Sequence, residues 1–288
     1  MNKVFLVKKR FEILHVNKHF GKLTIDEVQE RLKERIRKFR RYGFTVDDIV
    51  LDVGTGSGID LLALFLINPK IDGVGIDVSK QALRFAKRIL PKQNSELVQA
   101  DVLHLPFRGE VFDSINVSNM LHHHPLKFLR KAVLNLRSVL QKNGTILVKE
   151  PSVESERDAI LREIRILRHE LEDYTKSKKI AKSKKLQQRL LDSTPLFHYE
   201  TAYPSLLKKV FVENHLKVET FKIVREKFDV KERGKLLKEV VEEIDRSKLT
   251  ENERVYLFEK IQALEEKFGL IKPIGEKSMI LLLRKSRI

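Results

Sequence analysis

The chain contains no cysteine and no tryptophan, and only three of its 288 residues are methionine. Without cysteine it forms no disulfide, holds no metal through thiolates and carries no cysteine nucleophile. No apolar run reaches the roughly 18 residues that a membrane-spanning helix needs, so we expect no membrane span. The apolar patch near the start, Val4–Val7, is too short for the core of a secretory signal. We therefore expect a cytoplasmic protein.

Basic residues outnumber acidic ones, 57 to 40, which gives a formal net charge of +17. Residues 50–150 carry only a small part of this excess, and basic runs lie at 31–41 and 176–185. Such an excess favours an anionic partner such as RNA. The competing interpretation is the solvated surface of a thermophilic protein, which the abundance of Lys, Glu and Arg and the scarcity of Met also indicate.

Three glycines at alternate positions, Gly54, Gly56 and Gly58, follow a short apolar run, Ile49–Val53. The run is rich in β-branched residues and is typical of a buried parallel strand. A helical pattern begins at about Ile59, so the glycine loop joins a strand to the start of a helix. Glycine lets the backbone turn sharply and lets a ligand approach closely, and the helix directs its first N–H groups at that ligand. The segment therefore predicts a nucleotide-type cofactor site.

The glycine spacing argues against a dinucleotide cofactor. The dinucleotide fingerprint G-x-G-x-x-G needs its third glycine where this chain has Ile59. Asp52 also precedes the loop, and a carboxylate there would repel a pyrophosphate but attract a cationic ligand. A tight strand-to-helix turn without any ligand is the alternative interpretation.

Strands and helices alternate from residue 49 to 150, which predicts a parallel sheet with crossover helices. Two predicted strands end in acids, Asp77 and Asp101, and parallel strands present such residues at one edge of the sheet. There Asp77 would reach ribose hydroxyls and Asp101 an adenine amino group, with the N–H of Val102 near the ring. Taken singly, each acid is equally typical of a helix cap. The strands expected after the first are Gly73–Asp77, Glu96–Ala100, Ser114–Ser118 and Thr145–Lys149, with a helix over Pro125–Leu140.

These segments resemble the motifs of the class I S-adenosylmethionine-dependent methyltransferases. The resemblance covers about 45–150 and rests on the glycine loop, on Asp77 and Asp101, and on the run Asn119–His123. It implies a doubly wound, Rossmann-like α/β sheet of seven strands, in which Ser278–Leu283 is the antiparallel final strand. It also implies S-adenosyl-L-methionine as the cofactor. The residues that would bind this cofactor are Asp52, Gly54, Gly56, Ser57, Gly58, Asp77, Val78, Asp101, Val102 and Asn119.

Three consecutive histidines, His122–His124, follow the fourth predicted strand. Consecutive residues cannot all point at one ion, so we expect no metal site. His122 is the candidate for a general base or for orienting the methyl acceptor, and Glu150, after the fifth strand, is a second catalytic candidate. The alternative is that these residues only line the pocket, since methyl transfer from an activated sulfonium depends mainly on alignment.

The remaining segments are arranged around this core. We expect an N-terminal arm and amphipathic helix over 1–44, with the helix beginning at Thr24 in a capping box, and a methyltransferase domain over 45–288. A helical cap over 153–194 and a helical insertion over 231–268 would interrupt that domain. The family pattern accounts for neither, so we expect them to select the substrate.

The absence of three known motifs narrows the range of methyl-acceptor classes. No Asn/Asp-Pro-Pro-Tyr follows the fourth strand, the Lys-Asp-Lys-Glu set of ribose methyltransferases is incomplete, and the lack of cysteine excludes the thiol route to 5-methylpyrimidines. The Leu103–Phe107 loop and the Leu121–His123 run are similar to the ubiquinone/menaquinone-type branch, which favours a small-molecule acceptor. The alternatives are an RNA or protein methyltransferase that uses the basic surface, and a non-catalytic partner subunit that keeps the cofactor. The sequence does not set the oligomeric state.

Overall fold

The computed structural model describes residues 25–124, 126–153, 204–225 and 277–285, together with Val255, Glu259, Gln262 and Glu266. The four single positions are helical and exposed, and they fall in the insertion predicted over 231–268. The capping box at Thr24, nearly all of the cap predicted over 153–194 and the rest of the insertion lie outside the described residues.

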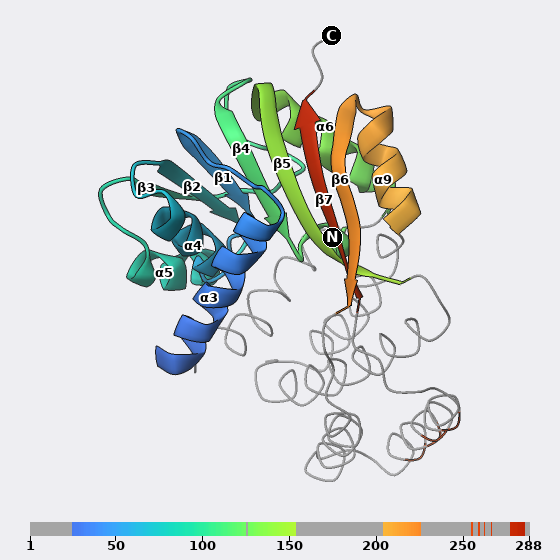
Figure 1. Ribbon diagram of the computed structural model, residues 1–288, viewed down its shortest axis with the longest axis horizontal. Coiled ribbons are helices and arrows are strands. Elements are labelled where there is room, and N and C mark those ends of the chain that lie inside the picture. Colours follow the sequence, from blue (N-terminus) through green and yellow to red (C-terminus); the bar gives the residue numbers. More distant parts are fainter. Residues whose placement is uncertain are drawn as a thin grey trace, which may run out of the picture.

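Seven strands form one sheet in the order β3-β2-β1-β4-β5-β7-β6 (Figure 1). Each neighbouring pair from β3 to β5 is parallel, and β7 is antiparallel to both β5 and β6. This arrangement confirms the predicted seven-stranded α/β sheet with an antiparallel final strand. The strands are β1 (Ile49–Val53), β2 (Asp72–Asp77), β3 (Ser95–Gln99), β4 (Phe112–Ser118), β5 (Leu140–Ser152), β6 (Leu216–Arg225) and β7 (Lys277–Lys285).

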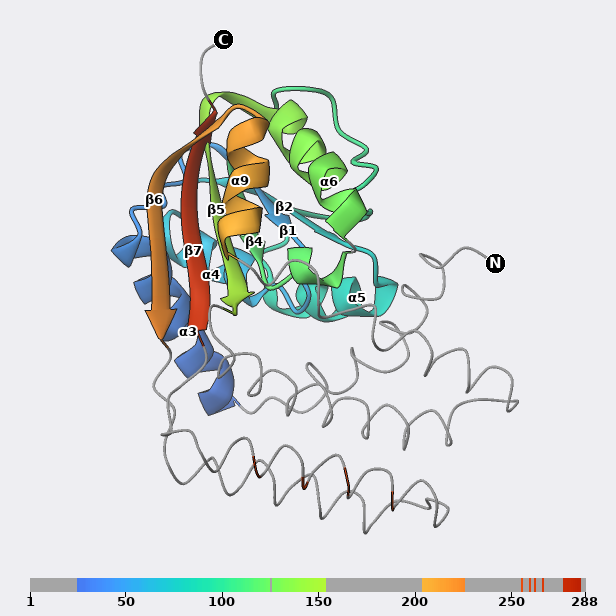
Figure 2. The same cartoon turned by 90° about the vertical axis from the view of Figure 1, so that its right-hand side faces the viewer.

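Helices cover both faces of the sheet (Figures 1 and 2). Successive side chains of a strand point to opposite faces, so Val50 packs with the helices of one face and Leu51 with those of the other. None of the described helices is long and apolar enough to cross a membrane. One face carries α3 (Ile25–Arg41), α4 (Ile59–Ile67) and α5 (Lys80–Ile89); the other carries α6 (Leu126–Val139) and α9 (Pro204–Glu213), and a short 3-10 helix, η2 (Leu121–His123), follows β4.

Helix α3 packs against the apolar core beside α4. Phe39 is fully buried, its ring centroid lies 5.6 Å from that of Phe44, and both belong to an apolar cluster with Leu61 and Leu64 of α4. The division into units 1–44 and 45–288 stays a prediction. Within the described residues, however, α3 shares a core with α4.

The boundary between α6 and β5 differs from the sequence prediction. The helix ends at Val139 and the strand already begins at Leu140, whereas the helix was expected to reach Leu140 and the strand to start at Thr145. Asn143 has a φ of 66°, and a Cβ on Gly144 would lie 2.8 Å from the carbonyl of Asp113. The Asn-Gly pair therefore shapes the irregular first part of β5 and does not close the helix.

Asp113 of β4 fixes the start of β1. Its carboxylate accepts hydrogen bonds from the backbone N–H groups of Asp47 (3.3 Å), Asp48 (3.1 Å) and Ile49. This contact lies at the amino ends of β1 and β4, where Val50 is in register with Ser114. By setting where β1 begins, Asp113 also sets where the glycine loop emerges at the opposite edge.

We expect Asp113→Ala to lower the free energy of unfolding by about 1–3 kcal/mol, because three N–H groups lose a charged acceptor. Urea unfolding followed by circular dichroism measures the loss. Asp72→Ala removes an exposed carboxylate at the start of β2 and is the matched control, with an expected change within about 0.5 kcal/mol. Equal midpoints for the two variants would show that Asp113 does not hold β1.

Candidate active site

The loop between β1 and α4 requires its three glycines. Gly54, Gly56 and Gly58 have φ angles of 72°, 54° and 82°, in the left-handed region that a Cβ disfavours. A Cβ on Gly54 would lie 2.8 Å from Met120 Cγ, and one on Gly58 would lie 3.0 Å from Ala86 Cβ. The loop thus packs closely between α5 and the segment after β4, and Gly58 starts α4 without a side-chain cap.

Asp77, at the end of β2, holds the centre of this loop. It is 6% exposed, and its two oxygens accept from the N–H of Gly56 (2.9 Å) and of Ser79 (2.8 Å). Ser79 in turn caps α5 by accepting from Ala82 N–H at 3.2 Å. An ionised carboxylate accepts about four hydrogen bonds, so these contacts are compatible with binding ligand hydroxyls as well. Val78 follows directly, and its carbonyl accepts from the side chain of Gln99 (3.0 Å).

Asp101 stands in a tight turn, two residues after the end of β3. Its Oδ1 accepts from Leu103 N–H (3.0 Å), and its carbonyl accepts from His104 N–H (2.8 Å). Val102 is 3% exposed, and its carbonyl accepts from Asn135 of α6 at 2.9 Å. Helix α6 therefore anchors the turn that carries Asp101 and Val102.

The segment after β4 turns back over the glycine loop. Asn119 has a φ of 53°, a conformation that asparagine tolerates better than most residues. Its N–H donates to the carbonyl of Lys149 in β5 (2.8 Å). The next residue is Met120, whose side chain lies against Gly54. The ends of β1 and β4 are thus locked together at the carboxyl edge of the sheet.

Glu150, near the end of β5, is fully buried and accepts hydrogen bonds from the segment after β4. Its Oε1 accepts from the N–H groups of Met120 and Leu121, both at 2.8 Å, and its Oε2 accepts from His122 N–H at 3.4 Å. The Nδ1 atom of His122 lies 2.6 Å from the same Oε2. The structure thus brings the two catalytic candidates together, and the contact fixes the orientation of the buried His122 ring.

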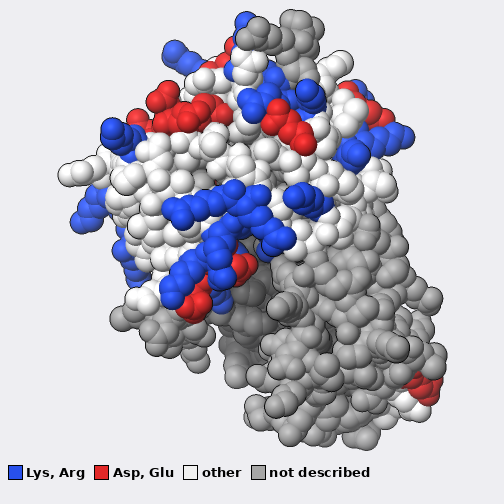
Figure 3. All heavy atoms as spheres, in the orientation of Figure 1, with Lys and Arg blue, Asp and Glu red and all other residues white. Residues whose placement is uncertain are grey.

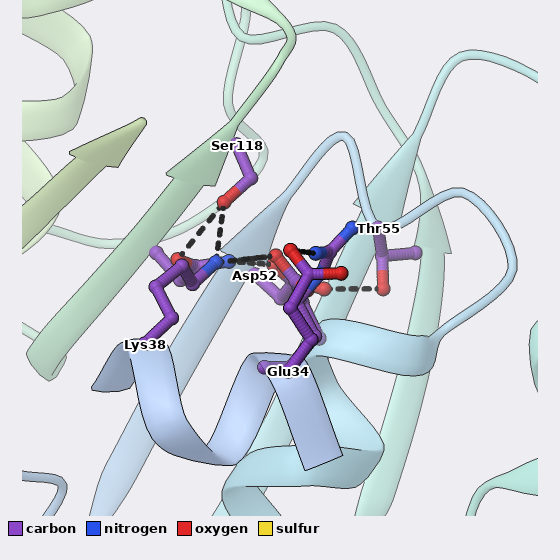
Figure 4. A network of polar contacts seen from close by, with 8 residues as sticks. Glu34, Lys38, Asp52, Thr55 and Ser118 are labelled. Carbon is purple, nitrogen blue, oxygen red and sulfur yellow. Dashed lines mark hydrogen bonds and ion pairs between the residues drawn. The ribbon is translucent and has the colours of Figure 1, made fainter. Parts of the chain in front are cut away.

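Asp52 lies beneath the glycine loop in a buried polar network (Figure 4). Its carboxylate accepts from Thr55 Oγ1 (2.6 Å) and from Asn116 Nδ2 (2.7 Å). Asn116 is fully buried, and its Nδ2 also donates to Asp60 in the first turn of α4 (3.2 Å). The carboxylate of Asp52 therefore faces this network, on the side of the sheet that α3 and α4 cover.

Helix α3 supplies the positive charge of the network. Arg35 Nε lies 2.6 Å from one carboxylate oxygen of Asp60, and Lys38 Nζ lies 3.0 Å from the other. Burial and the nearby charge of Asp60 raise the pKa of Asp52 to about 6. Burial acts the same way on Asp60, but Lys38 and Arg35 outweigh it and hold the pKa of Asp60 well below its usual value.

A family model described as a methyltransferase domain matches residues 44–195. The chain belongs to this family. Two curated relatives match shorter stretches of the chain. One is an uncharacterized methyltransferase of Alkaliphilus oremlandii, 32% identical over 134 residues, which are 43% of this chain and 60% of the relative. The other is the human "Probable tRNA methyltransferase 9B", 27% identical over 123 residues, 42% of this chain and 25% of the relative. The chain thus spans less than two thirds of the length of either relative.

Solved structures share the fold of the methyltransferase domain. A provisionally assigned methyltransferase from Bacillus halodurans has a TM-score of 0.60 at 20% identity, over 88% of this chain and 99% of the other. An S-adenosylmethionine-dependent methyltransferase from Archaeoglobus fulgidus has a TM-score of 0.51 at 15% identity, over 93% and 97%. At these identities the likeness concerns the fold alone.

Membership of this family implies S-adenosylmethionine as the cofactor, and the residues present fit it. The glycine loop leaves no room for a Cβ at Gly54 or Gly58, and the uncapped start of α4 follows it. Carboxylates stand at the ends of the next two strands, as an adenosine requires. The roles of the individual residues toward the cofactor stay predictions.

All the predicted site residues lie at the carboxyl edge of the sheet, but Asp52 and Glu150 turn their carboxylates into the protein. Sequence reasoning missed Asn116, Asp60 and the two α3 cations as parts of one network. One signal was available: Asp60 is the only polar residue in α4, whose sequence is IDLLALFLI.

The folded-state pKa of Asp52 lies above its ordinary value of 3.8, so the folded protein binds the Asp52 proton more tightly than the unfolded chain. The resulting stability is fully present below about pH 4 and is lost as pH rises through about 6. The Asp52→Asn variant has no carboxylate to ionise at this position. We therefore expect its free energy of unfolding to exceed that of the wild type by about 2–3 kcal/mol once the pH has risen from about 4 to about 6. Urea unfolding at half-unit pH steps measures the gain, with Asp72→Asn as the exposed control. Parallel profiles for wild type and Asp52→Asn would contradict the assignment.

Proposed function

We propose that this protein is an S-adenosylmethionine-dependent methyltransferase with a small-molecule acceptor, of the ubiquinone/menaquinone-type branch. The observation that carries the proposal is the glycine loop. Three left-handed glycines lie between a buried strand and an uncapped helix, and Asp77 is hydrogen bonded to the central one, Gly56. No pyrophosphate-type spacing accompanies this loop.

Each part of the site has a distinct role in this proposal. The glycine loop accommodates the methionine part of the cofactor, Asp77 binds the ribose, and Asp101 with the N–H of Val102 binds the adenine. The cofactor, when bound, supplies a methyl group on an activated sulfonium. The chain's own contribution is alignment, because Glu150 holds the segment Met120–His122 through hydrogen bonds to its N–H groups.

His122 orients the acceptor and takes up its proton where the reaction releases one. With Nδ1–H donated to Glu150, the other ring nitrogen is the one that accepts a proton. His122 is 7% exposed and Glu150 is fully buried, so an acceptor must enter the protein to reach this pair. A small molecule meets that condition more readily than a nucleotide within an RNA strand. The alternative, that the pair only shapes the pocket wall, stays open.

An RNA acceptor is the second candidate, and the surface of α3 favours it. Exposed arginines at positions 31, 37, 40 and 41 lie along this helix, and Figure 3 shows basic side chains gathered on the face where α3 lies. The name of the human relative, "Probable tRNA methyltransferase 9B", points in the same direction. A non-catalytic subunit that only binds the cofactor is the third candidate, and turnover on any acceptor would exclude it.

We expect the purified protein to bind S-adenosylmethionine and S-adenosylhomocysteine, and not NAD. Asp77→Ala should weaken the binding of both by about 1–3 kcal/mol, because the variant loses a charged acceptor for the ribose hydroxyls. Isothermal titration calorimetry measures this, with Asp72→Ala as the control that should bind like the wild type. Tight NAD binding without S-adenosylmethionine binding would refute the cofactor, and an unchanged affinity of Asp77→Ala would leave Asp77 as a structural residue only.

A filter-binding titration on total RNA distinguishes the two acceptor classes. It is run across a salt series with methyl-labelled S-adenosylmethionine. If the basic runs serve RNA, binding should weaken with salt with a log–log slope of about −0.7 per phosphate contact. If a small molecule is the acceptor, RNA binding should be weak and lost at physiological salt, and no label should enter the RNA. Sub-micromolar binding that persists at physiological salt, with label in the RNA, would overturn the small-molecule preference.

A further inference from the structure

Lys38 is a buried lysine of α3 that contacts both α4 and β4. Although it belongs to a strongly basic helix, it is only 8% exposed. Its Nζ lies 3.0 Å from Asp60 Oδ2 at the start of α4 and 3.0 Å from Ser118 Oγ at the end of β4. Figure 4 shows Lys38 reaching from α3 toward Ser118 and the region of Asp52.

Both contacts end next to segments of the site. Asp60 follows the last glycine of the loop, Gly58, by two residues. Ser118 directly precedes Asn119, whose left-handed backbone starts the segment that packs on Gly54. The ammonium group of Lys38 therefore connects α3 to both the glycine loop and the segment after β4.

The electrostatics explain why a cation is needed at this point. Asp52 and Asp60 both accept from the amide of Asn116, so two carboxylates share one donor in a buried place. Like charges at this separation repel strongly in a low dielectric. Arg35 and Lys38 each occupy one oxygen of Asp60, which keeps Asp60 ionised and fixes the first turn of α4.

We propose that α3 is a working part of the cofactor site, and that Lys38 is a positioning residue that clamps the glycine loop and the β4 end in their ligand-binding arrangement. The inference rests on the proposed function, since it assigns the clamp to a site for S-adenosylmethionine. Lys38 acts through Asp60 and Ser118 and does not itself contact the cofactor. Without the clamp, the glycine loop retains Asp77 but loses the fixed start of α4.

Hydrogen exchange on the free protein tests the clamp without any ligand. Two amides report on the clamp: the N–H of Leu62 donates to the carbonyl of Gly58, and the N–H of Asn119 donates to the carbonyl of Lys149. In Lys38→Met, both amides should exchange at least tenfold faster, while the amides of β7 stay protected. In Ser118→Ala, which removes one arm and keeps the ion pair, Asn119 should respond more strongly than Leu62. The control is Lys33→Met, the same change in the same helix at an exposed lysine paired with Glu30; it should alter neither amide.

Calorimetry with S-adenosylhomocysteine then links the clamp to the site. Lys38→Met should bind at least tenfold more weakly than Lys33→Met. Equal affinities of Lys38→Met and Lys33→Met, or uniform acceleration of exchange that includes β7, would overturn the clamp. If the wild type bound no S-adenosylhomocysteine, the proposed function would fall, and the exchange pattern alone would decide the clamp.

Discussion

Two carboxylates buried against a single amide impose the main constraint on this structure. Asp52 and Asp60 share Asn116, and removing one partner from such a buried ionic group leaves an uncompensated charge that costs several kcal/mol. The balancing cations come from α3, a helix that precedes the sheet in the chain. The start of α4, the glycine loop and the end of β4 therefore all depend on a helix that a motif search would leave outside the domain.

The parts of the fold that the sequence predicted well are those specified locally. A β-branched run, three glycines and an apolar helix are contiguous, and β1 spans the expected residues while α4 begins at the expected Ile59. Asp77, the last residue of β2, and Asp101, two residues after β3, lie at the same sheet edge, because parallel strands present their carboxyl ends together. The α6–β5 boundary was misplaced, because the polar run Gln141–Gly144 is typical of a loop but lies inside β5.

The polar network was not predictable in the same way. Lys38 and Asp60 are 22 residues apart, and Asn116 and Asp60 are 56 apart, so no local pattern pairs them. A lysine within a basic helix is usually solvated. Strand alternation did contain part of the answer, since Asp52 must point to the same face as the buried Val50. The role of Glu150 depends likewise on the backbone turn at Asn119, for which the sequence offers no periodic signal.

The order of strands at the far edge of the sheet has a consequence for assembly. β7 lies between β5 and β6, although it follows β6 by some 50 residues along the chain. Among the described strands β6 pairs only with β7, so it joins this sheet only once residues 277–285 have been added. Synthesis of the chain from its N-terminus can complete the glycine loop and the parallel strands early, but the antiparallel edge closes only through a contact distant in sequence, which is the slow kind of step in folding.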